Sequence, residues 1–311
     1  MKKKYNMALA LGGGGARGLA HVGVLKALQR ENVKIDLIVG TSMGAIIGAM
    51  YAQTGDAYEV EERVISFLES FLKDKGWIEA LNTQREENKQ SLLSEISNYV
   101  QRRYLGLKAL TRISLEKKES LYEPLKEILD NNNIEDSQIS FAAVSLDLVT
   151  GESAVLTEGP IVDAVYASAA IEGVFPPLEH NGGCLSDGGP VNITPVEIAR
   201  KMDARRVLAV DVHQKIQKIH KFANGLEVIM RADNIGLNRL RQIDLSLADI
   251  VIAPSVGSIH WANFNKAKEC IRRGEQAGEM MMPSLKKMIK HKGWFAQLKA
   301  GARLLFKDLS E

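Results

Sequence analysis

The sequence predicts an α/β fold built on one doubly wound, mostly parallel sheet. Residues 7–11 form a short apolar run, followed by glycines and then by apolar residues at helical spacing over 19–28. Residues 37–39 repeat this pattern ahead of a helix of small residues over 43–52. Strand and helix patterns also alternate after residue 138, as is typical of a parallel sheet covered by helices.

The remaining elements follow from the same patterns. Strands are predicted over 139–148, 154–156, 206–212 and 249–254, and helices over 161–170, 195–201, 225–244 and 263–282. One doubly wound layer accommodates all of them.

Residues 56–133 interrupt this alternation with successive charged helices and no convincing strand. The run from Ser120 to Glu123 fits a capping box that opens one of these helices. A helical insertion at this point lies near the carboxyl edge of the sheet, where ligands bind in open α/β folds. It therefore serves either as a lid over a site or as structural packing.

Composition limits the classes of partner. The chain has 311 residues, of which 45% are hydrophobic, enough for a large buried core. A net charge of +2 gives no global field that attracts nucleic acid, so no nucleic-acid partner is expected. Cys184 and Cys270 fit neither a disulfide framework nor a metal pattern, so no metal and no cofactor are expected.

The start of the chain and the lengths of its apolar runs predict a cytoplasmic location. The start of the chain has a basic beginning, but four glycines cut its apolar run short of the roughly 7 to 15 residues of a signal-peptide core. No run of about 18 apolar residues occurs that would span a bilayer.

Ser42 lies between two glycines in the sequence GTSMG, residues 40–44. This fits the G-x-S-x-G nucleophile elbow, a strained strand-to-helix turn that exposes a serine oxygen. By composition alone, a chain of this length matches the pattern on the order of one time in ten, so the pattern is weak by itself. The apolar strand before Gly40 and the helix after Gly44 strengthen it, because the turn requires both.

A second glycine-rich turn spans residues 12–18, again between a strand and a helix. It satisfies the G-x-G-x-x-G dinucleotide fingerprint, but the second strand leads into the Ser42 turn and does not end at an acidic residue. Backbone N–H groups in such a loop can instead stabilise an oxyanion, which acyl transfer requires. Arg17 within the loop either anchors it to a neighbouring carbonyl or contacts a phosphate.

A serine nucleophile needs a base. None of the six histidines (His21, His180, His213, His220, His260 and His291) lies in a turn that presents it to Ser42. Asp187 lies in a glycine turn ahead of a helix, where an aspartate is most often only a turn former that bonds the local backbone. The residues alone leave both roles open for Asp187.

These three segments occur in the order typical of the patatin-like phospholipase family: the glycine loop of residues 12–18, the Ser42 turn, and Asp187 with the two glycines after it. Residues 167–177 and 271–288 resemble further segments of that family. The chain therefore resembles a compact bacterial member over residues 5–288, with 56–133 as its helical insertion. The resemblance implies a three-layer α/β/α fold with a mostly parallel central sheet.

The resemblance also implies a Ser-Asp dyad in place of a triad, which would explain the missing histidine. Ser42 would be the nucleophile and Asp187 its base, with the loop of Gly13, Gly14 and Gly15 as the oxyanion hole. An acyl-Ser42 intermediate would then be hydrolysed by water. Glu172 departs from the family, which commonly has proline there, so we expect the loop or the pocket to differ at this position.

The pattern of side chains over residues 289–311 predicts a membrane contact. Trp294, Leu298, Ala302, Leu305 and Leu309 share one helical face, and several lysines precede them. A basic amphipathic helix of this kind either lies on an anionic membrane or docks on the protein's own core.

The leading hypothesis is thus a serine lipid acyl hydrolase that acts on phospholipids or lysophospholipids, peripherally at the inner face of the membrane. The alternatives are an acyltransferase that uses the same acyl-Ser42, and a regulatory or lipid-binding module without turnover. The sequence does not predict the oligomeric state.

Overall fold

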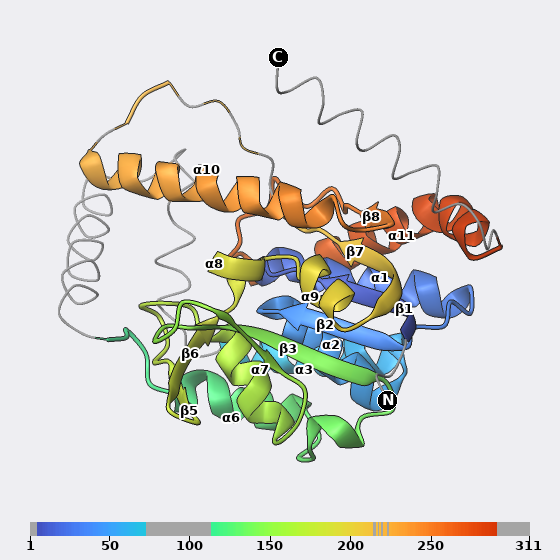
Figure 1. Cartoon of the computed structure of the whole chain (residues 1–311), viewed down its shortest axis with the longest axis horizontal. Helices are drawn as coiled ribbons and strands as arrows, with labels where there is room; N and C mark the ends of the chain where they lie inside the picture. Colours follow the sequence, from blue (N-terminus) through green and yellow to red (C-terminus); the bar gives the residue numbers. More distant parts are fainter. Residues whose placement is uncertain are drawn as a thin grey trace.

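The computed structural model describes residues 5–72, 113–213, 216, 218, 220–222 and 224–290. Within them, one eight-stranded sheet runs through the middle of the molecule (Figure 1). Its strands are β1 (Tyr5–Leu11), β2 (Leu37–Thr41), β3 (Ser140–Asp147), β4 (Ser153–Leu156), β5 (Leu178–His180), β6 (Gly183–Asp187), β7 (Ala204–Val210) and β8 (Ile250–Ile252). Six of them match predicted strands, and β5 and β6 are additional.

The sheet order is β5-β6-β3-β2-β1-β7-β8, with β4 also paired to β3. The pairs β1–β2, β1–β7, β2–β3 and β7–β8 are parallel. The pairs of β3 with β4, β3 with β6 and β5 with β6 are antiparallel. The predicted α/β class with a mostly parallel sheet is therefore confirmed, with an antiparallel edge formed by the strands that lead to Asp187.

The helices in the described part of the chain are α1 (Ala20–Arg30), α2 (Met43–Thr54), α3 (Ala57–Leu72), α6 (Glu119–Ile128), α7 (Ile161–Ala169), α8 (Gly189–Asn192), α9 (Val196–Lys201), α10 (Gly225–Leu245) and α11 (Ala267–Lys290). Three short 3-10 turns accompany them: η1 (Gly15–Leu19), η2 (Ile134–Asp136) and η3 (Phe264–Lys266). The predicted last helix begins later than expected and continues past Met282, because Pro283 is accommodated within α11.

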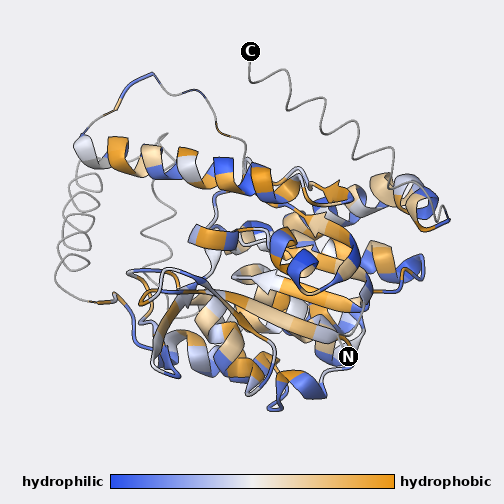
Figure 2. Ribbon diagram, viewed as in Figure 1, coloured by the Kyte–Doolittle hydropathy of each residue, from blue (hydrophilic) through white to orange (hydrophobic). Residues whose placement is uncertain are grey.

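Two hydrophobic cores lie on opposite faces of the sheet. Strand β1 shows the division, since Leu9 and Leu11 belong to the larger core while Ala8 and Ala10 belong to the smaller one. Helices α1, α2, α7 and α11 contribute to the larger core, and α9 to the smaller. Figure 2 shows the hydrophobic residues concentrated on the strands and on the helices beside them. The sheet, with helices packed on each of its two faces, forms the predicted three layers.

Helices α1 and α11 cross in direct backbone contact. A Cβ atom added to Gly23 would lie 1.9 Å from the carbonyl oxygen of Ile271, and one added to Gly274 would lie 1.9 Å from that of Ala20. No side chain fits at either position. These two glycines therefore fix how closely the carboxyl-terminal helix packs behind the first glycine-rich turn.

The described ends of the predicted insertion are helical, as α3 and α6. The capping-box prediction was wrong: α6 begins at Glu119, and Ser120 lies inside its first turn. The Ser120 hydroxyl donates a hydrogen bond to the carboxylate of Glu116 at 3.0 Å. Residues 73–112 of the insertion and 291–311 of the predicted tail lie outside the described residues.

Candidate active site

Ser42 lies at the junction of β2 and α2, in a strained backbone conformation. Its φ of 56° and ψ of −124° are in a region that residues other than glycine seldom occupy. Its backbone N–H donates to Ser168, with both the carbonyl and the hydroxyl oxygen at 3.1 Å. The Ser168 hydroxyl in turn donates to the carbonyl of Val144 at 2.6 Å. Packing from α7 and β3 thus holds the turn in place.

The glycines on either side of Ser42 are required by close backbone approach. A Cβ at Gly40 would lie 2.5 Å from the carbonyl oxygen of Gly44, and a Cβ at Gly44 would lie 2.1 Å from that of Leu11. Strand β2, the turn and helix α2 therefore pack with backbone against backbone. This is the geometry of a nucleophile elbow. The amino end of α2 also brings partial positive charge close to the serine oxygen.

Asp187 is the last residue of β6, and its side chain meets Ser42. The carboxylate interacts with the Ser42 hydroxyl, and it accepts a hydrogen bond from the backbone N–H of Gly189 at 2.8 Å. Asp187 is thus both a turn former and a partner of the serine. The two roles that its sequence left open coexist.

Burial raises the pKa of Asp187 from 3.8 to about 7. The hydrogen bond from Ser42 opposes this shift, and the negative charge of Glu172 adds to it. Glu172 is exposed. Its carboxylate accepts a hydrogen bond at 2.9 Å from the hydroxyl of Ser186, the residue before Asp187. Asp187 therefore has the proton affinity of a base that works near neutral pH.

The first glycine-rich loop packs beside the elbow. A Cβ at Gly13 would lie 3.2 Å from the Cβ of Ser42. The N–H of Gly13 is already used, since it donates to the carbonyl of Ile193 at 2.7 Å. Among the described residues, no acceptor receives the N–H of Gly14 or Gly15. Of the three predicted donors, Gly13 is therefore the one whose N–H is engaged within the described structure.

Arg17 is buried behind this loop, with 8% of its surface exposed. Its Nε donates to the carbonyl of Gly14 at 3.4 Å. Burial lowers the pKa of Arg17, and the nearby charge of Asp211 counteracts that effect. Asp211 is paired with the buried Arg241 of α10. Of the two roles that the sequence left open for Arg17, this geometry is that of a loop anchor.

Two histidines, His21 and His213, lie near the glycine loop. The Nε2 of His21 lies 2.7 Å from the carbonyl oxygen of Gly12, so this buried ring holds the glycine loop. Burial lowers the pKa of His21 to about 4, and burial together with the charges of Arg17 and Arg241 lowers that of His213 to about 4. Both rings are therefore neutral at pH 7. His291 lies outside the described residues.

A cavity of about 50 Å³ adjoins Ser42. Apart from Ser42 and Gly15, its lining is apolar: Met43, Ile46, Phe67, Leu121, Ala169, Phe175 and Phe264. Phe67 belongs to α3 and Leu121 to α6, so both described ends of the insertion contribute to its wall. Ligand pockets usually measure about 300 Å³ or more, so an acyl chain requires these side chains to move apart.

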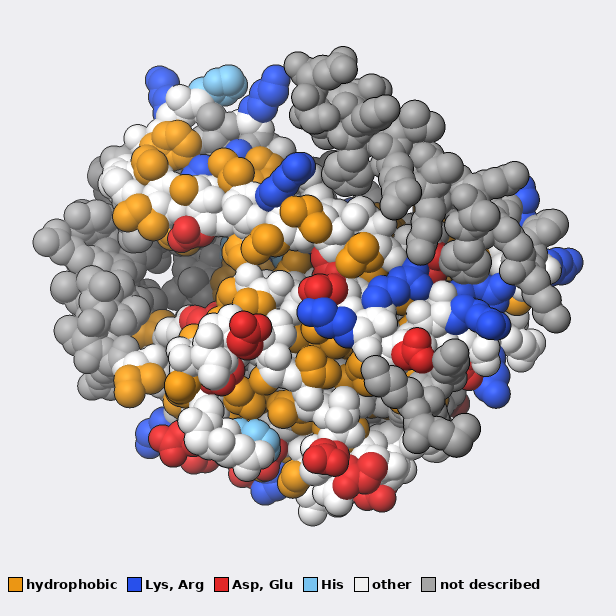
Figure 3. Space-filling view, viewed as in Figure 1, with side chains coloured by type: hydrophobic (Ala, Val, Ile, Leu, Met, Phe, Trp, Pro, Cys, Tyr) orange, Lys and Arg blue, Asp and Glu red, His pale blue; other side chains and the backbone are white. Residues whose placement is uncertain are grey.

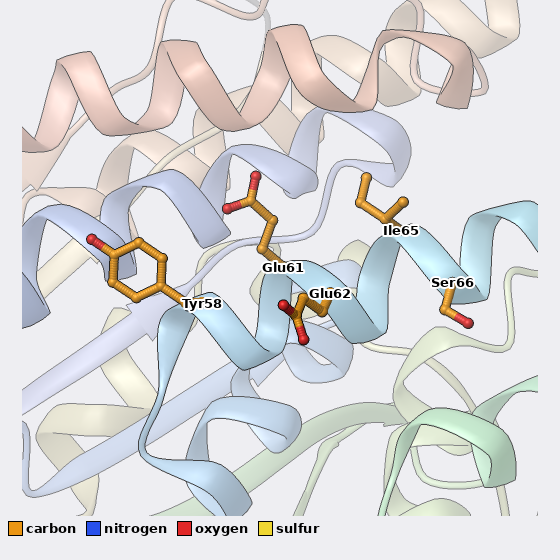
Figure 4. A pocket seen from close by; sticks show the side chains of 5 residues that line it. All are labelled: Tyr58, Glu61, Glu62, Ile65 and Ser66. Carbon is orange, nitrogen blue, oxygen red and sulfur yellow. The ribbon is translucent and has the colours of Figure 1, made fainter.

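A wider hollow of about 520 Å³ lies elsewhere, along α3. Figure 4 shows its five lining residues (Tyr58, Glu61, Glu62, Ile65 and Ser66), all of which come from that one helix. Glu61 is paired with Lys26 at 2.8 Å. Neither Ser42 nor Asp187 borders this hollow, and we assign the hollow no chemistry.

Two further findings apply to the described part of the chain. It holds no group of three or more His, Cys, Asp or Glu side chains placed to bind a metal ion. None of its helices is long and apolar enough to cross a membrane.

The sequence matches the family model described as patatin-like phospholipase over residues 9–200. That stretch contains the glycine loop, the Ser42 elbow and Asp187. The chain belongs to the patatin-like phospholipase family. The expected family membership and three-layer fold are thereby confirmed.

Curated relatives of the family are similar over two thirds of the chain. A patatin-like phospholipase domain-containing protein of Caenorhabditis elegans, ZK370.4, is 34% identical over 208 residues, and human patatin-like phospholipase domain-containing protein 6 is 31% identical over the same length. Each match covers 66% of this chain but 13% of the relative. The crystal structure of VipD from Legionella pneumophila superposes with a TM-score of 0.51 at 13% identity, covering 91% of this chain and 67% of VipD. The relatives are thus much longer proteins, and VipD shares the fold.

The sequence patterns did not point to Ser168 or to the Asp211–Arg241 pair, and they did not predict that His21 holds the glycine loop. Ser168 falls in the segment 167–177 that resembles the family, which was a signal that could have found it. The other residues lie in ordinary helix and strand patterns, so nothing in the sequence marks them as neighbours of the glycine loop.

Proposed function

We propose that this protein is a serine lipid acyl hydrolase in which Ser42 is the nucleophile and Asp187 the general base. The observation that carries this proposal is the placement of the Ser42 hydroxyl, at the apex of a strained strand-to-helix turn, beside the buried carboxylate of Asp187. A hydroxyl is a weak nucleophile until a base accepts its proton. The pKa of about 7 makes Asp187 such a base.

The first half of the reaction transfers the acyl group to the enzyme. The Ser42 oxygen attacks the carbonyl carbon of the ester while Asp187 accepts the hydroxyl proton. The oxyanion of the tetrahedral intermediate is stabilised by the N–H groups of Gly14 and Gly15, which are free to donate. The C–O bond to the alcohol then breaks, and Asp187 returns the proton to the departing alcohol. Acyl-Ser42 remains.

The second half uses water. Asp187 accepts a proton from a water molecule that attacks the acyl-Ser42 ester, and the same N–H groups stabilise the second oxyanion. Collapse of this intermediate releases the fatty acid and returns the proton to Ser42. The anchors of the loop (Arg17 on Gly14, His21 on Gly12) keep the donors in place through both halves.

The substrate class that we propose is a phospholipid or lysophospholipid. The apolar wall around Ser42, formed in part by Phe67, Leu121 and Phe175, suits a fatty-acyl chain. A relative from Kluyveromyces lactis named lysophospholipase NTE1 is 29% identical over 212 residues, which supports a lipid ester.

Covalent labelling with a fluorophosphonate tests the proposal. We expect the probe to modify Ser42 in the wild type, and neither label nor ester hydrolysis in Ser42→Ala. Asp187→Asn should lose hydrolysis while remaining folded. Ser66→Ala, the same substitution at an exposed serine of α3, is the matched control and should keep full activity. Full hydrolysis by Ser42→Ala and Asp187→Asn would exclude the dyad.

Mass spectrometry of the products from a mixed lipid extract then identifies the ester. Free fatty acid that appears with wild type and not with Ser42→Ala supports hydrolysis. Acyl transfer in place of hydrolysis would appear as a new ester that forms only when an alcohol or thiol acceptor is added.

A further inference from the structure

Helix α10 turns an apolar face toward solvent. Val228, Ala232, Ile235, Arg239 and Ile243 recur every three or four residues and so share one side of the helix. All five are exposed, as are their neighbours Ile229, Gly236 and Leu240. We call these eight residues the outward stripe. Seven of them are apolar, whereas a surface helix normally presents polar residues to water.

The opposite side of α10 is fixed to the protein, so the outward stripe cannot turn inward. Arg241 is buried and paired with Asp211. Asp244 is also buried, and its carboxylate accepts a hydrogen bond from the backbone N–H of Glu197, at the start of α9, at 2.6 Å. Figure 1 shows α10 lying along one side of the molecule, with its amino-terminal end extending beyond α8.

The exposed apolar residues of the protein are concentrated here. Of the fifteen large hydrophobic side chains that are exposed in the described part of the chain, nine lie between Ile216 and Leu247. Figure 3 shows them gathered over α10, with lysine or arginine side chains close by. A patch of this kind on a folded protein marks an interaction surface.

The charges around the outward stripe indicate which surface it meets. Lys218 and Lys221 precede α10 and are exposed, next to the exposed apolar Ile216 and Phe222. The sequence from residue 212 to 226 contains three lysines, two histidines and no acidic residue. Arg239 adds a positive charge within the stripe itself. Cations interleaved with exposed apolar side chains are the pattern of helices that lie on anionic lipid.

We propose that the outward stripe of α10, together with the basic segment before it, docks this protein on an anionic lipid surface. This inference rests on the proposed function, since a lipid acyl hydrolase must reach its substrate at an interface. Helix α10 packs on α8, which begins at Gly189, two residues after Asp187. Docking through α10 therefore places the lipid surface beside the segment that carries the base.

A second copy of this chain is the less suitable occupant. Pairing the outward stripe with itself would remove Arg239 of both copies from water, and none of the eight stripe residues is acidic, although Asp233 is exposed at the edge of the stripe. Lipid headgroups supply that negative charge and leave the arginine at the water interface.

Vesicle flotation tests the proposal in a Ser42→Ala background, where binding does not depend on turnover and the lipid stays intact. The stripe variant carries Ile229→Gln, Ile235→Gln and Ile243→Gln. Its matched control carries Ile113→Gln, Val149→Gln and Met280→Gln, which remove exposed apolar side chains outside α10. A third variant carries Lys218→Gln, Lys221→Gln and Arg239→Gln. Circular dichroism and thermal unfolding confirm that each variant is folded.

We expect the Ser42→Ala protein to bind phosphatidylcholine vesicles that contain phosphatidylglycerol. The stripe variant should bind about tenfold more weakly or worse, because three apolar side chains no longer enter the interface. The control should bind like its parent. The charge variant should lose binding to the anionic vesicles. Its binding to pure phosphatidylcholine vesicles should change little, because those vesicles carry no net charge. With Ser42 present, the stripe variant should keep hydrolysis of a soluble short-chain ester and lose hydrolysis of vesicle lipid.

Unchanged vesicle binding by the stripe variant would overturn the proposal. So would binding that is lost on removal of residues 291–311 but kept by the stripe variant, since the tail would then be the docking element. A wild-type dimer in size-exclusion chromatography that the stripe variant converts to a monomer would assign the surface to a second copy. Because flotation uses Ser42→Ala, a failure of the hydrolase proposal leaves the binding result interpretable.

Discussion

Replacing Asp187 by asparagine should stabilise the fold at neutral and alkaline pH while abolishing catalysis. Burial raises the pKa of this carboxyl from 3.8 to about 7 in the folded protein. Between these two values the folded state holds a proton that the unfolded state has released. The free energy of unfolding contributed by Asp187 therefore falls as pH rises through this window and is constant above it.

The size of the effect follows from the two pKa values. A shift from 3.8 to about 7 corresponds to on the order of 4 kcal/mol, at about 1.4 kcal/mol for each pH unit. About 1 kcal/mol of this is already lost at pH 4.5, so about 3 kcal/mol remains to be lost between pH 4.5 and 8.5. Asparagine cannot ionise, and its side-chain oxygen keeps the acceptor position for the N–H of Gly189.

Urea unfolding of wild type and Asp187→Asn at several pH values measures this difference. We expect the variant to gain stability relative to wild type steadily from pH 4.5 to about 7 and to keep that gain at higher pH. Titrations of His21 and His213 affect both proteins equally and cancel in the comparison. A difference that stays within about 0.5 kcal/mol over the whole range would refute the burial argument. The rate of ester hydrolysis by wild type should rise through the same pH region as Asp187 loses its proton.

Three further predictions concern single contacts. Glu172→Gln should lower the pH midpoint of hydrolysis by about half a pH unit, because one negative charge near Asp187 is removed, and a pH–rate profile measures the midpoint. Gly23→Ala should destabilise the protein by about 3 kcal/mol or more, since its Cβ would overlap the backbone of α11, whereas Gly236→Ala, with open space around its Cβ, should stabilise by about 0.5–1 kcal/mol in the same urea assay. Arg241→Met should lower stability by about 3 kcal/mol by leaving Asp211 buried without its partner, and adding Asp211→Asn should restore part of this; equal stability of Arg241→Met and wild type would contradict it.

The fold was predictable where the sequence pattern is local. The strand–loop–helix units around residues 12–18 and around Ser42 were predicted because apolar spacing and glycine placement decide them within about a dozen residues. The hairpin of β5 and β6 was not, because its strands are three and five residues long, carry no clean alternation, and contain glycines at their turn. These strands exist because they pair with each other and with β3, which is a tertiary contact.

The site divides in the same way. Ser42 and Asp187 were predicted from separate local turns, and the resemblance supplied their pairing. The hydrogen-bond partner of each backbone N–H in the first glycine-rich loop was not predictable. The hydrogen bond from the Gly13 N–H to Ile193 joins residues 180 positions apart, and the charges that act on the buried Arg17 come from Asp211 and from Arg241 of α10. Long-range contacts of this kind leave no mark on the sequence around either partner.

One physical constraint links the dyad to its surroundings. An exposed aspartate is too weak a base to accept a serine proton near pH 7, so a two-residue device of this kind requires a desolvated carboxyl. Desolvation favours the protonated form, and the interactions with the Ser42 side chain and the Gly189 N–H counteract that tendency. The negative charge of Glu172 acts in the same direction as burial. The pKa of the base is thus set by two contributions that raise it and two that lower it, and Glu172 is the one of them that can be altered without touching Asp187, Ser42 or the turn that holds them.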